Sequence, residues 1–333
     1  MRNRPTFFLF AALLILALTA CGQTTPETQK ILFVNTIAVT KTATVTATMT
    51  PTRTSVMVTT STPIAIPTLP KEDASARLLD LLANNGGCRL PCVWGITPGK
   101  STYQEAQAIL MPLSSISIFT DFVAQTGVIH TWYKEDELIL STAVVFYVDI
   151  DSNDQIITKL TFKAEELKEL SDGGRGSIYD SKTFGERVRP YMLSEVLSQL
   201  GKPDLVEVQT YGRQITGTGG FEMVLLYPNQ GVLVHYVTQM QTAGGNAKGC
   251  LTNAKVEMEI YPSGNADSFV KALSNTLIWA IFVKEEPVDN LSWKPIDKAT
   301  SMSLEQFYET FRESNDKCIE TPMKIWATPE DFH

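Results

Sequence analysis

The segment Met192-Leu-Ser-Glu-Val-Leu-Ser-Gln-Leu-Gly-Lys-Pro-Asp-Leu-Val-Glu-Val-Gln-Thr-Tyr211 decides the fold. Its first nine residues have the spacing of a short helix. Gly201 ends this helix with Pro203 just beyond, because glycine is the usual residue after a helix C-terminus. Residues 205–211 then predict a strand. We therefore expect a helix that leads directly into antiparallel strands.

The same order, a helix and then strands, is expected on both sides of this segment. Before it, we expect helices over about 74–83 and 102–111 and strands over 117–124, 128–133, 138–148 and 155–163. After it, we expect strands over 221–227, 232–238 and 254–261 and helices over about 266–274 and 303–314. This predicts an α+β fold of two consecutive helix-plus-antiparallel-meander units, suggesting a tandem duplication, with a C-terminal helical segment. The expected ranges are 71–170 for the first unit, 171–187 for a linker and 188–333 for the second unit.

Two short motifs resemble known bacterial proteins. The phrase Ser194-Glu-Val-Leu-Ser-Gln-Leu-Gly-Lys-Pro-Asp204, followed by strands, resembles the small-lipoprotein fold of the SmpA/OmlA outer-membrane assembly factor. The same fold class, in tandem, forms β-lactamase-inhibitor proteins. The stretches Pro91-Cys-Val-Trp-Gly-Ile-Thr-Pro-Gly99 and Cys318-Ile-Glu-Thr-Pro322 are similar to uncharacterised bacterial lipoproteins. These resemblances imply a fold, and a fold alone does not define a function.

The N-terminus resembles that of a bacterial lipoprotein. Leu18-Thr19-Ala20-Cys21 matches the lipobox, after two arginines and an apolar run over about 7–18. In that family the cysteine carries a diacylglycerol and acyl chains such as palmitate, and cleavage occurs just before it. The resemblance implies a signal peptide over 1–20, lipidation of Cys21, and a position on the extracytoplasmic side of a membrane, in the periplasm or at the cell surface. A transmembrane helix is the alternative, but the run falls short of the roughly 20 residues that a bilayer requires.

The residues after Cys21 have the composition of a tether. Residues 36–70 are rich in threonine, serine and proline and carry only two charges, Lys41 and Arg53. Such segments form extended stalks that are often O-glycosylated. We expect residues 21–70 to be a disordered tether, and a flexible coil of this length spans roughly 40 Å.

The charge of the chain limits its partners. Without the signal peptide it has 26 basic and 36 acidic residues, a formal charge of −10. An acidic surface is unsuited to nucleic acid, because phosphate binding needs a basic patch. We therefore expect membrane attachment through lipid on Cys21, no nucleic-acid partner, and an envelope protein or polymer of unknown identity as the ligand.

Four cysteines remain after Cys21, and an even number in an exported chain predicts two disulfides. Three pairings are open, of which we favour Cys88–Cys92 with Cys250–Cys318. The second pair would close a loop of about 69 residues, which is worth about 4 kcal/mol in the chain-entropy model. The alternative is a redox or copper-handling lipoprotein in which Cys88 and Cys92 act as thiolate ligands. The residue after the second cysteine is Val93, where copper chaperones of this kind have proline.

No catalytic motif is recognisable in the chain, which favours a protein without enzymatic activity, metal or cofactor. Asp149 to Asp154 resembles a calcium loop but lacks its glycine and glutamate. Ser314 and Lys317 match Ser-x-x-Lys without the accompanying motifs.

Aromatic side chains are the remaining candidates for ligand binding. They are Trp94, Trp132 and Tyr133, because tryptophan and tyrosine are enriched where proteins bind partners. Trp94 more often packs on a neighbouring disulfide than contacts a ligand. His130 and Trp132 would share one face of a strand, and we expect at least one of them to be in the core.

Overall fold

The computed structural model describes residues 67–326 apart from 123–125, 136, 150–153, 172, 180, 182, 212–218 and 274–292. All of the described residues belong to one compact unit, Thr62–His333. The lipobox and the tether up to residue 66 lie outside the described residues, so lipidation of Cys21 stays a prediction.

Five helices of the described residues lie close to where the sequence predicts them: α2 (Lys71–Asn84), α3 (Tyr103–Leu110), α5 (Leu193–Leu200), α6 (Ala266–Leu273) and α9 (Leu304–Phe311). The sequence did not predict two short helices, α4 (Phe184–Arg187) and α8 (Ile296–Ala299). A capping box begins α3, in which the Thr102 hydroxyl accepts from the Glu105 N–H and the Glu105 carboxylate accepts from the Thr102 N–H. Within the described ranges, no helix combines the length and the apolar character needed to cross a membrane.

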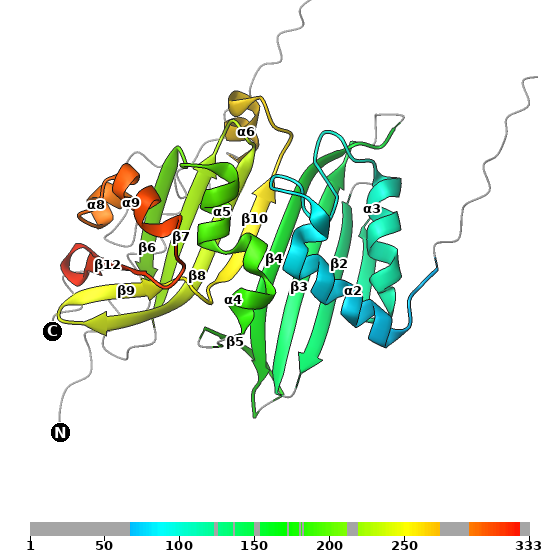
Figure 1. Cartoon of the computed structure of the whole chain (residues 1–333), viewed down its shortest axis with the longest axis horizontal. Coiled ribbons are helices and arrows are strands. Elements are labelled where there is room, and N and C mark those ends of the chain that lie inside the picture. The colour runs from blue at the N-terminus through cyan, green and yellow to red at the C-terminus, as the bar shows by residue number, and fades with distance from the viewer. Residues whose placement is uncertain are drawn as a thin grey trace, which may run out of the picture. The chain divides into compact units, whose positions relative to one another are not determined.

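Within the part of the chain that the structure describes, the strands form one twelve-stranded antiparallel sheet. They are β1 (Ser117–Phe122), β2 (Thr126–Glu135), β3 (Leu138–Val148), β4 (Ile157–Glu169), β5 (Arg175–Ile178), β6 (Leu205–Tyr211), β7 (Gly220–Tyr227), β8 (Val232–Ala243), β9 (Asn246–Cys250), β10 (Lys255–Ile260), β11 (Lys294–Pro295) and β12 (Cys318–Pro322). The main order across the sheet is β1-β2-β3-β4-β10-β8-β7-β6-β11, with β5 on β4 and β12 on β9 (Figure 1). The α+β class predicted from the sequence is confirmed.

The two halves of the sequence share this sheet through the pairing of β4 with β10. Val256 to Ile260 lie opposite Ala164 to Leu160 in register. The segment 171–187, predicted as a linker, contributes β5 to the edge of β4 and contains α4, whose Phe184 is buried. Its glycines and polar residues suggest a loop, but backbone pairing with β4 orders it.

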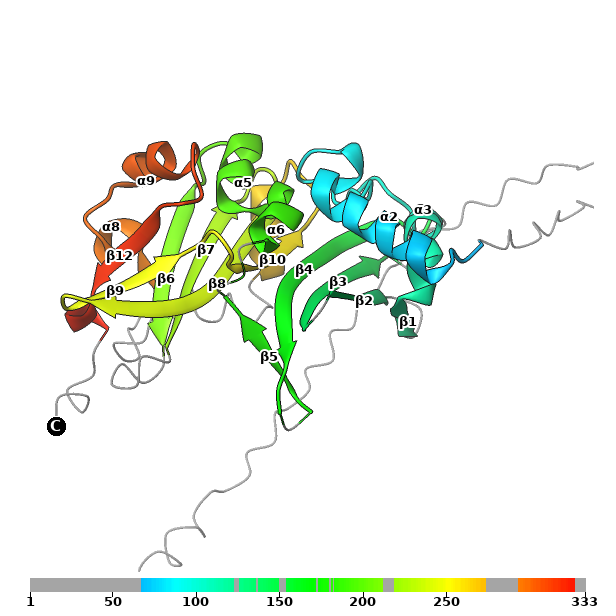
Figure 2. The same ribbon diagram turned by 60° about the horizontal axis from the view of Figure 1, so that its bottom comes forward.

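The helices α2, α3, α5 and α9 cover one face of the sheet (Figures 1 and 2). The main core lies beneath them and includes Leu78, Val144, Phe162, Leu197 and Phe307. On the other face a smaller apolar cluster forms where Phe269 of α6 and Trp293 pack on Val224, Leu226 and Leu233. We call this second face the rear face of the sheet.

Candidate functional site

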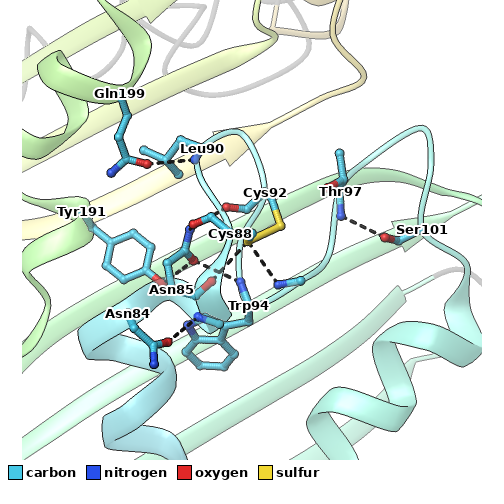
Figure 3. Close-up of a disulfide and its surroundings, with 12 residues drawn as sticks. Asn84, Asn85, Cys88, Leu90, Cys92, Trp94, Thr97, Ser101, Tyr191 and Gln199 are labelled. Carbon is cyan, nitrogen blue, oxygen red and sulfur yellow. Dashed lines mark hydrogen bonds between the residues drawn. A yellow bond between two sulfur atoms is a disulfide. The ribbon is translucent and has the colours of Figure 1, made fainter.

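The buried side chain of Asn85 organises the loop that carries Cys88 and Cys92 (Figure 3). Its Nδ2 donates to the carbonyl oxygens of Cys88 (3.0 Å) and Cys92 (2.8 Å). Its Oδ1 accepts from the Trp94 N–H (3.1 Å) and from the Tyr191 hydroxyl (2.8 Å). All four hydrogen-bonding positions of this amide are therefore used.

These contacts join the loop to the second half of the sequence. The Leu90 N–H donates to Oε1 of Gln199 on α5 (2.9 Å), and the Tyr236 hydroxyl donates to the Tyr191 carbonyl oxygen (2.9 Å). Burial raises the pKa of Tyr191 far above its ordinary value, so its hydroxyl keeps the proton that it donates to Asn85. The Cys88 loop therefore fastens the two halves together.

Trp94 lies in the core and not on the surface. Its side chain is 2% exposed, and its ring meets that of Phe162 edge-on with centroids 5.9 Å apart. This burial favours the packing role expected for Trp94 over contact with a ligand. The reason is that the Cys88 loop turns back over the sheet and drives the indole inward.

Both expected cysteine pairs lie at disulfide distance. Cys88 and Cys92 have Cα atoms 5.9 Å apart, and Cys250 and Cys318 have Cα atoms 4.1 Å apart. Cys250 on β9 faces Cys318 on β12 directly across the strand pair. The sequence did not predict these two short strands, although the cysteine pairing was a signal that the segments meet.

Trp132 and Tyr133 lie on opposite faces of the sheet, as neighbours along a strand must. Tyr133 packs against the main core under the helices. Trp132 is half-buried on the rear face, with the His130 ring stacked at 6.1 Å and the Arg175 guanidinium 5.8 Å from its centroid. His130 is exposed, so neither ring is in the core, contrary to expectation. The described helices over this part of the sheet cover the opposite side of β2, so Trp132 is the accessible aromatic candidate among the described residues.

The rear face continues from Trp132 as a row of charged side chains. The register places Ser141 and Glu165 beside Trp132 in successive strands. The Glu165 carboxylate lies 3.4 Å from Lys163 Nζ and 3.5 Å from Lys255 Nζ, which joins β4 to β10. Further along, burial raises the pKa of Glu207 on β6 to about 7.

Two adjoining depressions follow the exposed side of α5, and together we call them the α5 groove. The larger, about 620 Å³, lies against the loop after β9 and the segment after α9. The smaller, about 440 Å³, lies against Cys88 and Arg89. Arg189, Glu195 and Ser198 line both. The acidic side chains of the lining are Glu186, Glu195, Glu313 and Asp316.

Two asparagines build the wall of the α5 groove. The Ser194 N–H of α5 donates to Asn315 Oδ1 (2.8 Å), and the Gly185 N–H of α4 donates to Asn253 Oδ1 (3.4 Å). Asn253 follows Cys250 by three residues and Asn315 precedes Cys318 by three. The second disulfide therefore holds together the two loops that line the groove.

No cluster of His, Cys, Asp and Glu side chains suited to a metal ion is present among the described residues. Comparisons of the chain with protein-family models, curated proteins and solved structures found no match. The function of the protein therefore has to be inferred from its own residues.

Proposed function

We propose that the protein is a lipoprotein, anchored through Cys21 on the extracytoplasmic side of a membrane, whose folded unit binds an envelope protein or polymer without catalysis. One observation supports this most. The four cysteines of the described unit all lie in pairs at disulfide distance, which leaves Cys21 as the fifth cysteine of the chain. A fifth cysteine at the end of a lipobox is suited to lipidation.

The rear face of the sheet supports a role in binding. Trp132 and Arg175 are residue types that dominate the energetics of protein interfaces. The Trp132 ring is stacked on His130 and has the Arg175 guanidinium 5.8 Å from its centroid, which limits the conformational freedom that Trp132 loses when a partner binds. A tether of roughly 40 Å would let this face reach partners away from the membrane.

Capture of envelope material by the purified protein tests the binding role. The bait is the chain from residue 21 with Cys21→Ser, which cannot carry a lipid on that residue. We expect a defined partner to be retained, and Trp132→Ala to reduce its recovery about tenfold, or about 1.4 kcal/mol. Tyr133→Phe is the matched control and should leave recovery unchanged. Equal recovery with Trp132→Ala would remove the rear face as the binding surface.

Thiol titration separates this proposal from the redox or copper-handling alternative. We expect no reactive thiol in the unreduced bait and four after denaturation with reductant. We also expect no copper to be retained at Cys88 and Cys92 after mild reduction. If the parent retains one equivalent of copper and Cys88→Ser retains none, the redox or copper-handling alternative is favoured.

A further inference from the structure

We infer, building on the binding function proposed above, that the α5 groove is a binding site for a neutral, extended, hydroxyl-rich chain such as a segment of an envelope polysaccharide. Its two depressions meet at Ser198, an exposed residue in the middle of α5. Their volumes, about 620 and 440 Å³, are in the range of ligand sites. The joined shape suits a chain and not a compact molecule.

The chemistry of the lining excludes an apolar ligand. Among the described residues that line the larger depression, none has an aliphatic or aromatic side chain. Sites for drug-like molecules are instead lined mainly by apolar side chains, with a few polar groups that fix orientation. An extended peptide with apolar side chains would likewise find no pocket for them in this depression.

The charges of the lining are mixed, with four carboxylates and three guanidinium groups over the two depressions. Within the lining, Nη2 of Arg189 lies 2.9 Å from Oε1 of Glu195, and Nη2 of Arg312 lies 3.9 Å from Oε1 of Glu313. A polyanion would meet the carboxylates of the groove, and a polycation would meet its guanidinium groups. Either ligand would have to break these pairs.

A hydroxyl-rich neutral chain can use both kinds of group. Each hydroxyl donates one hydrogen bond and accepts others, so it fits guanidinium and amide donors as well as carboxylate acceptors. Ser194, Ser198 and Thr252 add hydroxyls along the groove. Asn315 and Asn253 hold the N-terminal ends of α5 and α4, so the wall is preorganised before a ligand arrives.

Titration calorimetry with three neutral hexasaccharides tests the inference: chitohexaose, maltohexaose and mannohexaose. The protein is again the chain from residue 21 with Cys21→Ser. We expect saturable binding of at least one hexasaccharide, weaker binding of its disaccharide, and at least an about tenfold loss of affinity with Ser198→Trp. Ser268→Trp, on the exposed side of α6, is the matched control and should bind as the parent does.

The inference is overturned if none of the three hexasaccharides binds. It is also overturned if Ser198→Trp binds the hexasaccharide as tightly as the parent does, or if the anionic hexagalacturonate binds more tightly than the neutral hexasaccharides. Thermal melting of Ser198→Trp equal to that of the parent shows that the variant is folded. If envelope capture depends on Trp132 and not on Ser198, the groove inference fails while the proposed binding function stands. If no envelope material is captured by any variant, the proposed function itself fails.

Discussion

Removing the Asn85 side chain should destabilise the protein far more than an ordinary change at a helix end. Asn85 is 1% exposed, and Asn85→Ala leaves the buried Trp94 N–H and the Tyr191 hydroxyl without their acceptor. Each buried orphan donor costs about 1–3 kcal/mol, so the free energy of unfolding should fall by about 2–6 kcal/mol. The left-handed backbone at Asn85, with φ of 56°, adds to the loss because asparagine tolerates this region better than alanine.

Urea denaturation with calorimetry measures this difference, and the adjacent residue supplies the control. Asn84 is exposed and hydrogen-bonds to Asp80 and to the Gly86 N–H, so Asn84→Ala should cost less than about 1 kcal/mol. A double-mutant cycle of Asn85→Ala with Tyr191→Phe should show a coupling energy above about 0.5 kcal/mol. Equal stability of the two alanine variants, or full additivity in the cycle, would refute the idea that this amide fastens the halves together.

Three further predictions concern side chains of the sheet. Glu166 is 2% exposed, and its carboxylate oxygens have no hydrogen-bond partner among the described residues. Glu166→Leu should therefore raise the melting temperature, whereas Glu165→Leu, which breaks an ion network, should lower it. The folded-state pKa of Glu207, about 7, lies above its ordinary 4.5. Between pH 4.5 and about 7 the folded state therefore binds more protons than the unfolded state, so the stability of the parent falls as the pH rises through this range. The fall should be smaller in Glu207→Gln. Identical pH profiles of the melting temperature for the parent and Glu207→Gln would contradict this. Gly249→Ala places a Cβ against the Phe221 ring and should cost about 1–3 kcal/mol by chemical denaturation.

The elements that the sequence predicted well have strong local signals. The ranges 138–148 and 205–211 match β3 and β6 to the residue, and α5 starts one residue later than expected. In each case an apolar run is bounded by turn formers or by Gly201. Local pattern and local stop signals agree there, so little depends on distant parts of the chain.

The missed elements depend on contacts far apart in sequence. Residues 246–250 read Asn-Ala-Lys-Gly-Cys, which carries no strand pattern, and they become β9 because β8 and β12 pair with them. The pairing of β4 with β10 joins residues 92 to 100 positions apart in the sequence, and no local pattern predicts it.

The candidate site was predictable only in part. The cysteine pairs came from their number and spacing, and packing of Trp94 beside the first pair was the favoured interpretation. The sequence did not indicate the hydrogen bonds of the Asn85 side chain, which lies just past the end of a helix. The α5 groove is assembled from α5, the loop after β9 and the segment after α9. No sequence pattern within any one of these segments predicts the groove.

Labelling of growing cells with radioactive palmitate tests the central claim most directly. The wild-type chain should incorporate label and fractionate with membranes, and Cys21→Ser should lose both properties. The double variant Cys88→Ser/Cys92→Ser should retain label, because its lipobox cysteine is intact. Continued labelling of Cys21→Ser, or an unlabelled wild-type chain, would contradict the account of a lipid-anchored binding protein.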